Sequence, residues 1–242
     1  MPAKSSANGL LILIDLDGTM VSCGLIPRQA LTNAIFHHTG NMVEFGYSQL
    51  AGLTDPLIID GALERLAVPE SQRNELNHKI LKTYLSILAE WYPQATDRIL
   101  YPGVVELLEY FHECNFRVGL ISGNSKKGAG IKLKPFNLEQ YFSFGVFGSD
   151  HAERDNLPLI ALRKVYQKFN EKYAPDRVVI IGDTVRDVQC ARRNGMRSIV
   201  VIRRADQRQA ILNENPDMIV NNFEDLQPIQ HYLQQLLIPP FA

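Results

Sequence analysis

Short apolar runs alternate along the chain with longer stretches in which apolar residues recur every three or four positions. Short apolar runs bounded by turn residues are typical of strands buried on both faces of a parallel sheet, and the longer spacing is typical of amphipathic helices. The runs predict strands at 10–14, 117–121, 144–147, 178–181, 198–202 and 218–220. The spacing predicts helices at 104–114, 126–134, 157–173, 184–194 and 223–237. This alternation indicates an α/β fold with a Rossmann-like, doubly wound parallel sheet and right-handed crossovers.

One long segment, between residues 20 and 98, differs because its pattern is helical and shows no strand. Apolar positions at helical spacing predict helices at 27–39 and 71–91. Between them, Asp55 followed by Pro56 predicts the N-cap and first turn of another helix. We therefore expect an all-helical cap inserted after the first strand of an α/β core. The predicted domains are a core of residues 1–20 and 99–242 and a cap of residues 21–98.

The composition of the 242 residues is that of an ordinary soluble globule, with 45% apolar and 21% charged residues. The net charge of −1 and the lack of a long basic run argue against nucleic-acid binding through phosphate neutralisation. The cysteines Cys23, Cys114 and Cys190 show no zinc-like spacing and are expected to be reduced thiols of a cytoplasmic protein. The apolar run at 10–14 is too short to span a membrane, and we expect no membrane partner. A monomer is expected, with a homodimer as the alternative.

Two carboxylates, Asp15 and Asp17, directly follow the first predicted strand. They lie where open α/β sheets bind ligands, and alternation along an extended chain points them in the same direction. Like charges this close repel, so the pair either holds a cation or has two well-separated pKa values. Mg²⁺ prefers hard oxygen ligands of this kind. The alternative is an ordinary strand-to-loop turn, in which Asp and Gly are common.

Two further predicted strands also end in polar residues. The segment Ser122-Gly123-Asn124 places a hydroxyl and a glycine before a predicted helix, which suits an anion, although a simple capping turn is the alternative. Asp183 follows the strand at 178–181, and Asp187 lies one helical turn later on the same side. This second acidic pair is suited to complete a magnesium shell, whereas a helix N-cap and a solvated Asp are the alternative.

A cation in the loop after the strand at 144–147 completes the pattern. Arg154 precedes the helix at 157–173 and could reach a phosphoryl oxygen that is held by Ser122. The alternative is a surface arginine paired with the neighbouring Glu153 or Asp155.

Together these four motifs, in this order, resemble the four signatures of the haloacid dehalogenase superfamily in its phosphatase form. The helical insert resembles the cap of the phosphoglycolate phosphatase and β-phosphoglucomutase branch. The third signature departs from the pattern of most relatives, which carry Lys where this chain has Arg. The corresponding residues are Asp15-Leu16-Asp17-Gly18-Thr19, Ser122, Arg154, and Gly182-Asp183 with Asp187.

The resemblance implies a magnesium-dependent hydrolase that cleaves small phosphorylated metabolites through an aspartyl-phosphate. It makes Asp15 the nucleophile and Asp17 the general acid/base, with Ser122 and Arg154 neutralising the phosphoryl group. The metal ligands that it implies are Asp15, Asp17 through its main-chain carbonyl, Asp183 and Asp187.

Substrate contacts are expected on both sides of this site. Thr19, Gly123 and Asn124 would lie beside the phosphoryl group, and Thr54 and Asp55 would reach the leaving group from the cap. The alternative for the cap residues is that they only cap the helix that follows them.

Three other functions stay open at this point. A sugar phosphomutase of the same fold would keep every core residue named above. A dehalogenase would not need Asp17, whose presence therefore favours phosphoryl transfer. A non-catalytic binding module is disfavoured because all the acidic residues of the motifs are present.

Overall fold

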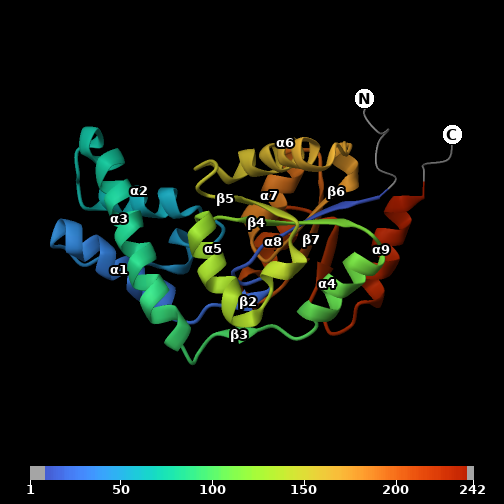
Figure 1. Cartoon of the computed structure of the whole chain (residues 1–242), viewed down its shortest axis with the longest axis horizontal. Helices are drawn as coiled ribbons and strands as arrows, with labels where there is room; N and C mark the ends of the chain where they lie inside the picture. Colours follow the sequence, from blue (N-terminus) through green and yellow to red (C-terminus); the bar gives the residue numbers. More distant parts are fainter. Residues whose placement is uncertain (1–8, 239–242) are drawn as a thin grey trace.

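The structure, a computed structural model, describes residues 9–238, and its centre is a six-stranded parallel sheet in the order β5-β4-β1-β6-β7-β8 (Figure 1). Every predicted strand is present, with ends that differ by at most one residue. The doubly wound α/β fold is therefore confirmed. The strands are β1 (Leu11–Ile14), β4 (Arg117–Ser122), β5 (Phe144–Phe147), β6 (Val178–Gly182), β7 (Arg197–Val201) and β8 (Met218–Val220).

Helices cover both faces of the sheet, because successive side chains of a strand point to opposite faces. Ile12 and Ile14 of β1 pack in one apolar cluster with α4, α5 and α9, whereas Leu11 and Leu13 pack in another with α6 and α7. Each such fully buried side chain contributes roughly 1.5–3 kcal/mol to stability. The helices are α4 (Val104–Glu113), α5 (Lys126–Leu133), α6 (Leu157–Phe169), α7 (Val185–Arg193), α8 (Arg208–Asn213) and α9 (Gln227–Leu237).

The segment between β1 and α4 forms a separate helical body at one end of the sheet, on the left of Figure 1. Its helices pack on their own apolar cluster, which includes Ile35 of α1, Leu63 of α2 and Leu88 of α3. The helices are α1 (Ile26–Thr39), α2 (Asp55–Arg65) and α3 (Glu70–Trp91).

The connection between this body and the sheet contains one feature that the sequence pattern did not reveal. The two-residue strands β2 (Val21–Ser22) and β3 (Ile99–Leu100) pair in antiparallel fashion where the chain leaves and re-enters the core. Two residues are too few to show the alternation by which strands are recognised. The domain limits at 20/21 and 98/99 stay a prediction, and residues 1–8 and 239–242 of the predicted core lie outside the described residues.

The start of α2 also differs from the prediction, because Thr54 and not Asp55 is the N-cap residue. Neither side chain bonds the helix end. The Asp55 carboxylate accepts a hydrogen bond from the Ser125 amide at 2.7 Å, and the Thr54 hydroxyl donates to the Ala152 carbonyl at 2.6 Å. Contacts with the core have thus replaced the local capping that the sequence suggested.

Further bonds join the cap to the core around this turn. The amide of Asp55 donates to the Gly123 carbonyl at 2.8 Å, and Arg186 of α7 donates to the Ala51 carbonyl at 2.6 Å. A Cβ atom on Gly123 would lie 2.1 Å from the carbonyl oxygen of Leu53, so only glycine permits this approach. The cap therefore lies directly on the loop that follows β4.

We predict that Gly103→Ala destabilises the protein by about 2 kcal/mol or more, because Gly103 has φ 78° and its Cβ would lie 2.0 Å from the Phe223 carbonyl oxygen. Gly61→Ala is the matched control, since Gly61 lies within α2 with open space around it. The control should stabilise the protein by about 0.5–1 kcal/mol. Urea unfolding measures both changes, and equal midpoints for the two variants would contradict the prediction.

Candidate active site

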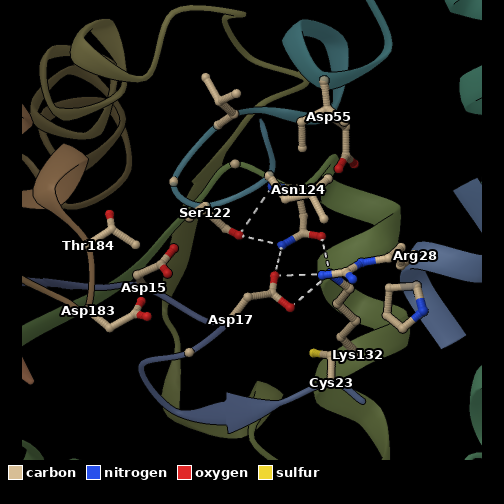
Figure 2. Close-up of a pocket in the computed structure, with 18 of the residues that line it drawn as sticks. Asp15, Asp17, Cys23, Arg28, Asp55, Ser122, Asn124, Lys132, Asp183 and Thr184 are labelled. Atoms are coloured by element: carbon tan, nitrogen blue, oxygen red, sulfur yellow. Dashed lines mark hydrogen bonds and ion pairs between the residues drawn. The ribbon is translucent and has the colours of Figure 1, made fainter. Parts of the chain in front are cut away.

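The carboxyl ends of the adjacent strands β4, β1 and β6 meet at one edge of the sheet, beneath the cap. A cavity of about 340 Å³ lies between this edge and the cap (Figure 2). The structure brings eight of the predicted site residues to this cavity. Its lining includes Asp15, Asp17, Asp55, Ser122, Gly123, Asn124, Arg154 and Asp183.

The loop after β1 is held in place from two sides. Gly18 has φ 82°, and a Cβ there would lie 2.2 Å from a carboxylate oxygen of Asp183. Arg203, which the sequence analysis did not identify, donates to the carbonyls of Gly18 and Thr19 at 3.0 and 2.8 Å. Its guanidinium stacks on Tyr101, 3.7 Å from the ring centroid. These contacts fix the loop that carries the two carboxylates.

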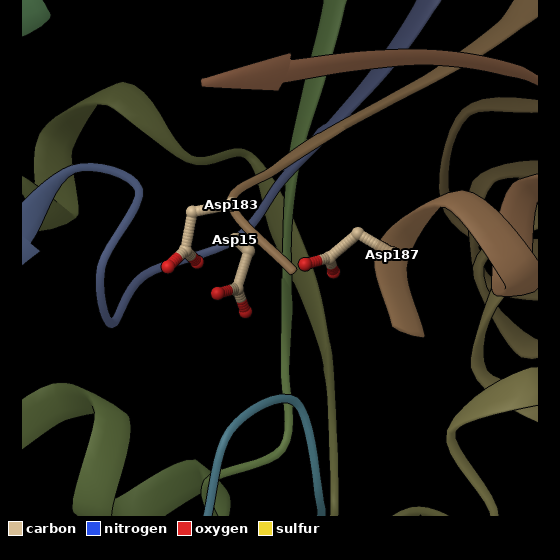
Figure 3. Close-up of side chains that lie close together, drawn as sticks. All are labelled: Asp15, Asp183 and Asp187. Atoms are coloured by element: carbon tan, nitrogen blue, oxygen red, sulfur yellow. The ribbon is translucent and has the colours of Figure 1, made fainter. Parts of the chain in front are cut away.

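Three buried carboxylates form an acidic cluster in which one oxygen from each of Asp15, Asp183 and Asp187 lies within 4.8 Å of the others (Figure 3). Burial, together with the neighbouring negative charges, raises the pKa of Asp15 to about 7 and raises the pKa of Asp183 well above its usual value. Within residues 9–238, Arg154 is the cation that pairs with the cluster, so about two negative charges remain uncompensated when all three groups ionise. Hard oxygens with such an excess of charge fit a divalent cation such as Mg²⁺.

Asp187 stands at the back of this cluster and does not line the cavity. Its Oδ2 accepts hydrogen bonds from the amide and hydroxyl of Thr184, the N-cap of α7, at 3.0 and 2.6 Å. Its Oδ1 accepts from Arg154. The alternative of a solvated carboxylate is wrong, since Asp187 is buried.

Arg154 is only 6% exposed, and its Nη2 donates to Asp15 at 3.0 Å and to Asp187. The alternative of a surface arginine is therefore wrong, and Asp155 pairs with Arg193 instead. The buried Nε of Arg154 has no hydrogen-bond partner within residues 9–238. The Nε atoms of Arg73 and Arg197, which lie outside this site, are also buried without a hydrogen-bond partner in the described part of the chain, so this atom by itself does not identify a ligand. What matters for the site is that the Arg154 side chain lines the cavity beside Asp15.

The last residue of β4, Ser122, brings a hydroxyl to the same cavity as Arg154. The Oγ of Ser122 accepts from the amide of Asn124 at 3.3 Å and from its side-chain nitrogen at 2.8 Å. In the part of the chain that the structure describes, the hydroxyl hydrogen of Ser122 has no acceptor. It is therefore free to donate to an anion in the cavity.

Asp17 belongs to a second network, separate from the acidic cluster. Lys132 of α5 donates to both of its carboxylate oxygens, at 2.9 and 3.0 Å, and Asn124 donates to it as well (Figure 2). Burial favours a raised pKa for Asp17, but the charge of Lys132 and these hydrogen bonds outweigh it and hold the pKa below its usual value.

The sequence analysis did not identify Lys132. This residue is 5% exposed, whereas Lys126 and Lys127 of the same helix are exposed. A signal was present, because Lys132 lies on the buried stripe of α5 together with small and apolar residues. A lysine at such a position is rarely buried without a partner.

The remaining predicted substrate contacts lie deeper than expected. Thr19 is fully buried and donates to Asp183 at 3.2 Å. Thr54 is also fully buried and does not line the cavity. Asp55 lines it, but its carboxylate already accepts the Ser125 amide, and burial raises its pKa to about 6.

Comparison with known proteins identifies the family. Residues 12–201 match the family described as haloacid dehalogenase-like hydrolase, and the chain belongs to this family. The chain is 26% identical over 219 residues to the phosphoglycolate phosphatase of Synechococcus elongatus, covering 89% of this chain and 94% of that protein. It is 23% identical over 235 residues to phosphoglycolate phosphatase 1 of Pseudomonas aeruginosa, covering 95% and 82%. The resemblance inferred from the motifs is confirmed, and the chain is an enzyme of the phosphoric monoester hydrolase class.

Solved structures support the fold. A phosphonoacetaldehyde hydrolase-like protein from Oleispira antarctica aligns with a TM-score of 0.71 and 18% identity, covering 98% of this chain and 97% of that chain. CbbY from Rhodobacter sphaeroides in complex with phosphate aligns with a TM-score of 0.68 and 18% identity, covering 90% and 96%. Among residues 9–238, no helix is both long and apolar enough to cross a membrane.

We predict that Asp183→Asn raises the melting temperature of the metal-free protein at pH 7.5 and removes most of the rise that Mg²⁺ causes. The folded state retains protons on Asp15 and Asp183 that the unfolded chain has lost, so metal-free stability falls as pH rises from about 4 to about 7. An asparagine side chain at position 183 would carry no negative charge, so the substitution removes the repulsion between residue 183 and the neighbouring carboxylates. It also removes one ligand of the metal.

Thermal unfolding with and without Mg²⁺ measures both effects. Asp176→Asn, which neutralises an exposed carboxylate, is the control and should respond to Mg²⁺ like the wild type. An unchanged response in Asp183→Asn would remove Asp183 from the metal site.

Proposed function

We propose that this protein is a cytoplasmic, magnesium-dependent phosphatase of small phosphomonoesters that acts through an aspartyl-phosphate. The observation that carries the proposal is the convergence of a carboxylate, a guanidinium and a hydroxyl on one cavity. Arg154 lines this cavity and donates to Asp15, and Ser122, whose hydroxyl hydrogen has no acceptor among the described residues, lines it as well. A guanidinium and a hydroxyl are donors suited to the oxygens of a phosphoryl group at the nucleophile.

In this proposal Asp15, the main-chain carbonyl of Asp17, and Asp183 would hold the metal, with Asp187 behind them. When bound, a divalent cation would supply positive charge to the acidic cluster and to the phosphoryl oxygens. The acidic cluster suits a divalent cation because it carries excess negative charge and because all of its possible ligand atoms are oxygens.

The first chemical step uses Asp15 and Asp17. A carboxylate oxygen of Asp15 attacks phosphorus, and the bond from phosphorus to the ester oxygen breaks. Asp17, which must bind a proton before this step although Lys132 lowers its pKa, gives that proton to the departing alkoxide. In the second step, Asp17 takes a proton from water as the water oxygen attacks phosphorus, and the bond to Asp15 breaks to release phosphate. Arg154 and Ser122 stabilise the charge on the phosphoryl oxygens in both steps.

The cap, which we assign to residues 21–98, closes the leaving-group side of the cavity. The cavity has a volume of about 340 Å³, which suits a small substrate. Two similar relatives are named for phosphoglycolate, a short phosphorylated acid, and we include this compound in the substrate class. Thr54 and Asp55 bond the core, so we assign them first to holding the cap in this position.

A phosphate-release screen over glycolate, sugar, polyol and nucleotide phosphates, with and without Mg²⁺, tests the proposal. We expect release from at least one small phosphomonoester, and only with the metal. Conversion of a sugar phosphate to its isomer without free phosphate would instead indicate a phosphomutase. No turnover across the panel would overturn the proposal.

We predict that Asp15→Asn abolishes turnover and the covalent trapping of phosphate, because it removes the nucleophile. Asp17→Asn should slow hydrolysis of an alkyl phosphate by roughly 10²–10⁴-fold, as for loss of a general acid/base. Quench-flow trapping of labelled phosphate and steady-state rates measure these effects. Wild-type labelling of Asp15→Asn would refute the nucleophile assignment.

We also predict that Arg154→Ala lowers the rate by roughly 10²–10³-fold, like loss of one oxyanion-hole donor. Lys126→Ala is the matched control, because Lys126 is exposed and its rate should stay near that of the wild type. Arg154→Lys keeps the charge but loses the fork, and should recover part of the rate. If Lys126→Ala were the inactive variant, the phosphoryl-binding cation would be misassigned.

A further inference from the structure

Lys132 is a buried cation for which the reaction described above has no role. It lies on the buried side of α5, together with Gly128, Ala129 and Leu133, and its side chain lines the cavity. Burying an ammonium group is costly unless it is fully paired. The Nζ meets this condition with three acceptor atoms, the two carboxylate oxygens of Asp17 and the Oδ1 of Asn124 at 2.6 Å.

The side chain of Asn124 links this pair to the phosphoryl-binding loop. Its Oδ1 accepts from Lys132, while its Nδ2 donates to Asp17 and to Ser122. The reverse amide orientation would place two donors against the ammonium, so Lys132 determines how the amide is turned. Lys132 and Asn124 thus hold the Asp17 carboxylate at an orientation set relative to Ser122 (Figure 2). The Cys23 thiol donates to the same carboxylate.

We propose that Lys132 is a positioning residue for Asp17 and directs the acid/base carboxyl toward the ester oxygen of the substrate. The role rests on the proposed phosphatase function. Asp15 and Arg154 belong to the other network and make no hydrogen bond to Lys132 among the described residues. Without the ammonium, Asp17 binds a proton more readily, but its carboxyl loses the contacts that fix its orientation. Because a proton is transferred only along an aligned hydrogen bond, loss of Lys132 should impair proton delivery to the leaving group and leave attack on phosphorus largely intact.

The leaving group of the substrate distinguishes this role from a structural one. An alkoxide needs a proton to depart, whereas p-nitrophenolate does not, because its conjugate acid is much stronger. The parameter kcat/KM reports the steps up to phosphoryl transfer to Asp15, and so isolates the acid role from the later attack of water. The ratio of kcat/KM for two substrates of one preparation does not depend on how much of the variant is folded.

The experiment compares the best alkyl phosphate of the screen with p-nitrophenyl phosphate. In Lys132→Met, we expect kcat/KM for the alkyl phosphate to fall roughly 10–100-fold further than for p-nitrophenyl phosphate, a part of the total acid/base contribution. In an Asp17→Asn background, the same substitution should leave the ratio of the two substrates unchanged. Lys127→Met, an exposed lysine of the same helix, should keep the wild-type ratio.

Equal losses on both substrates would overturn the proposal, because they indicate a structural role. A rise confined to KM for the alkyl phosphate would also overturn it, in favour of direct substrate binding. An additive effect in the Asp17→Asn background would show that Lys132 acts without Asp17. If wild-type protein hydrolyses neither substrate, the proposed function itself fails, which is a different result from any change in the ratio.

Discussion

The repulsion among carboxylates buried at one edge of the sheet is the constraint on which the site depends. Asp15, Asp183 and Asp187 converge because strands β1 and β6 are neighbours and α7 begins directly after β6. Such a cluster is costly in the folded protein unless cations or protons compensate it. Arg154 supplies one charge from within the chain. The remaining excess explains why the same residues that weaken the metal-free protein form a site for a divalent cation.

The charged groups divide into two networks that meet at the cavity. In one, Arg154 binds Asp15, which places a cation at the attacking carboxylate. In the other, Lys132 and Asn124 bind Asp17, on the side where the leaving group would depart. Each acidic residue of the first motif thus has its own cation, and the two carboxyl groups keep different pKa values although they are two residues apart. In the metal-free protein the order of these pKa values is the reverse of what the proposed roles need, since a nucleophile must be ionised and an acid must be protonated. A divalent cation bound at the acidic cluster would lower the pKa of Asp15 and favour its ionised form.

The cap takes part in this arrangement through its backbone as much as through its side chains. The turn before α2 lies on the loop after β4, where Gly123 permits the two main chains to approach. The Asp55 carboxylate and the Thr54 hydroxyl already form hydrogen bonds to backbone groups of the core. A cap attached in this way covers part of the cavity, and the charged groups that it buries interact more strongly than they would in water.

The sequence was enough to predict the parallel sheet, the succession of strands and helices along the chain, and the acidic residues that follow β1 and β6. Apolar runs and the residues that end them are local features of the chain. Arg154 was predicted for the same reason, as the cation of a loop in a fixed order of motifs. Only the tertiary structure decided that Lys132 binds Asp17, since 115 residues separate them, and that Asp55 bonds Ser125 instead of capping its own helix. Those contacts depend on how α5 and the cap pack against the sheet, and packing between distant segments leaves no periodic pattern in the sequence.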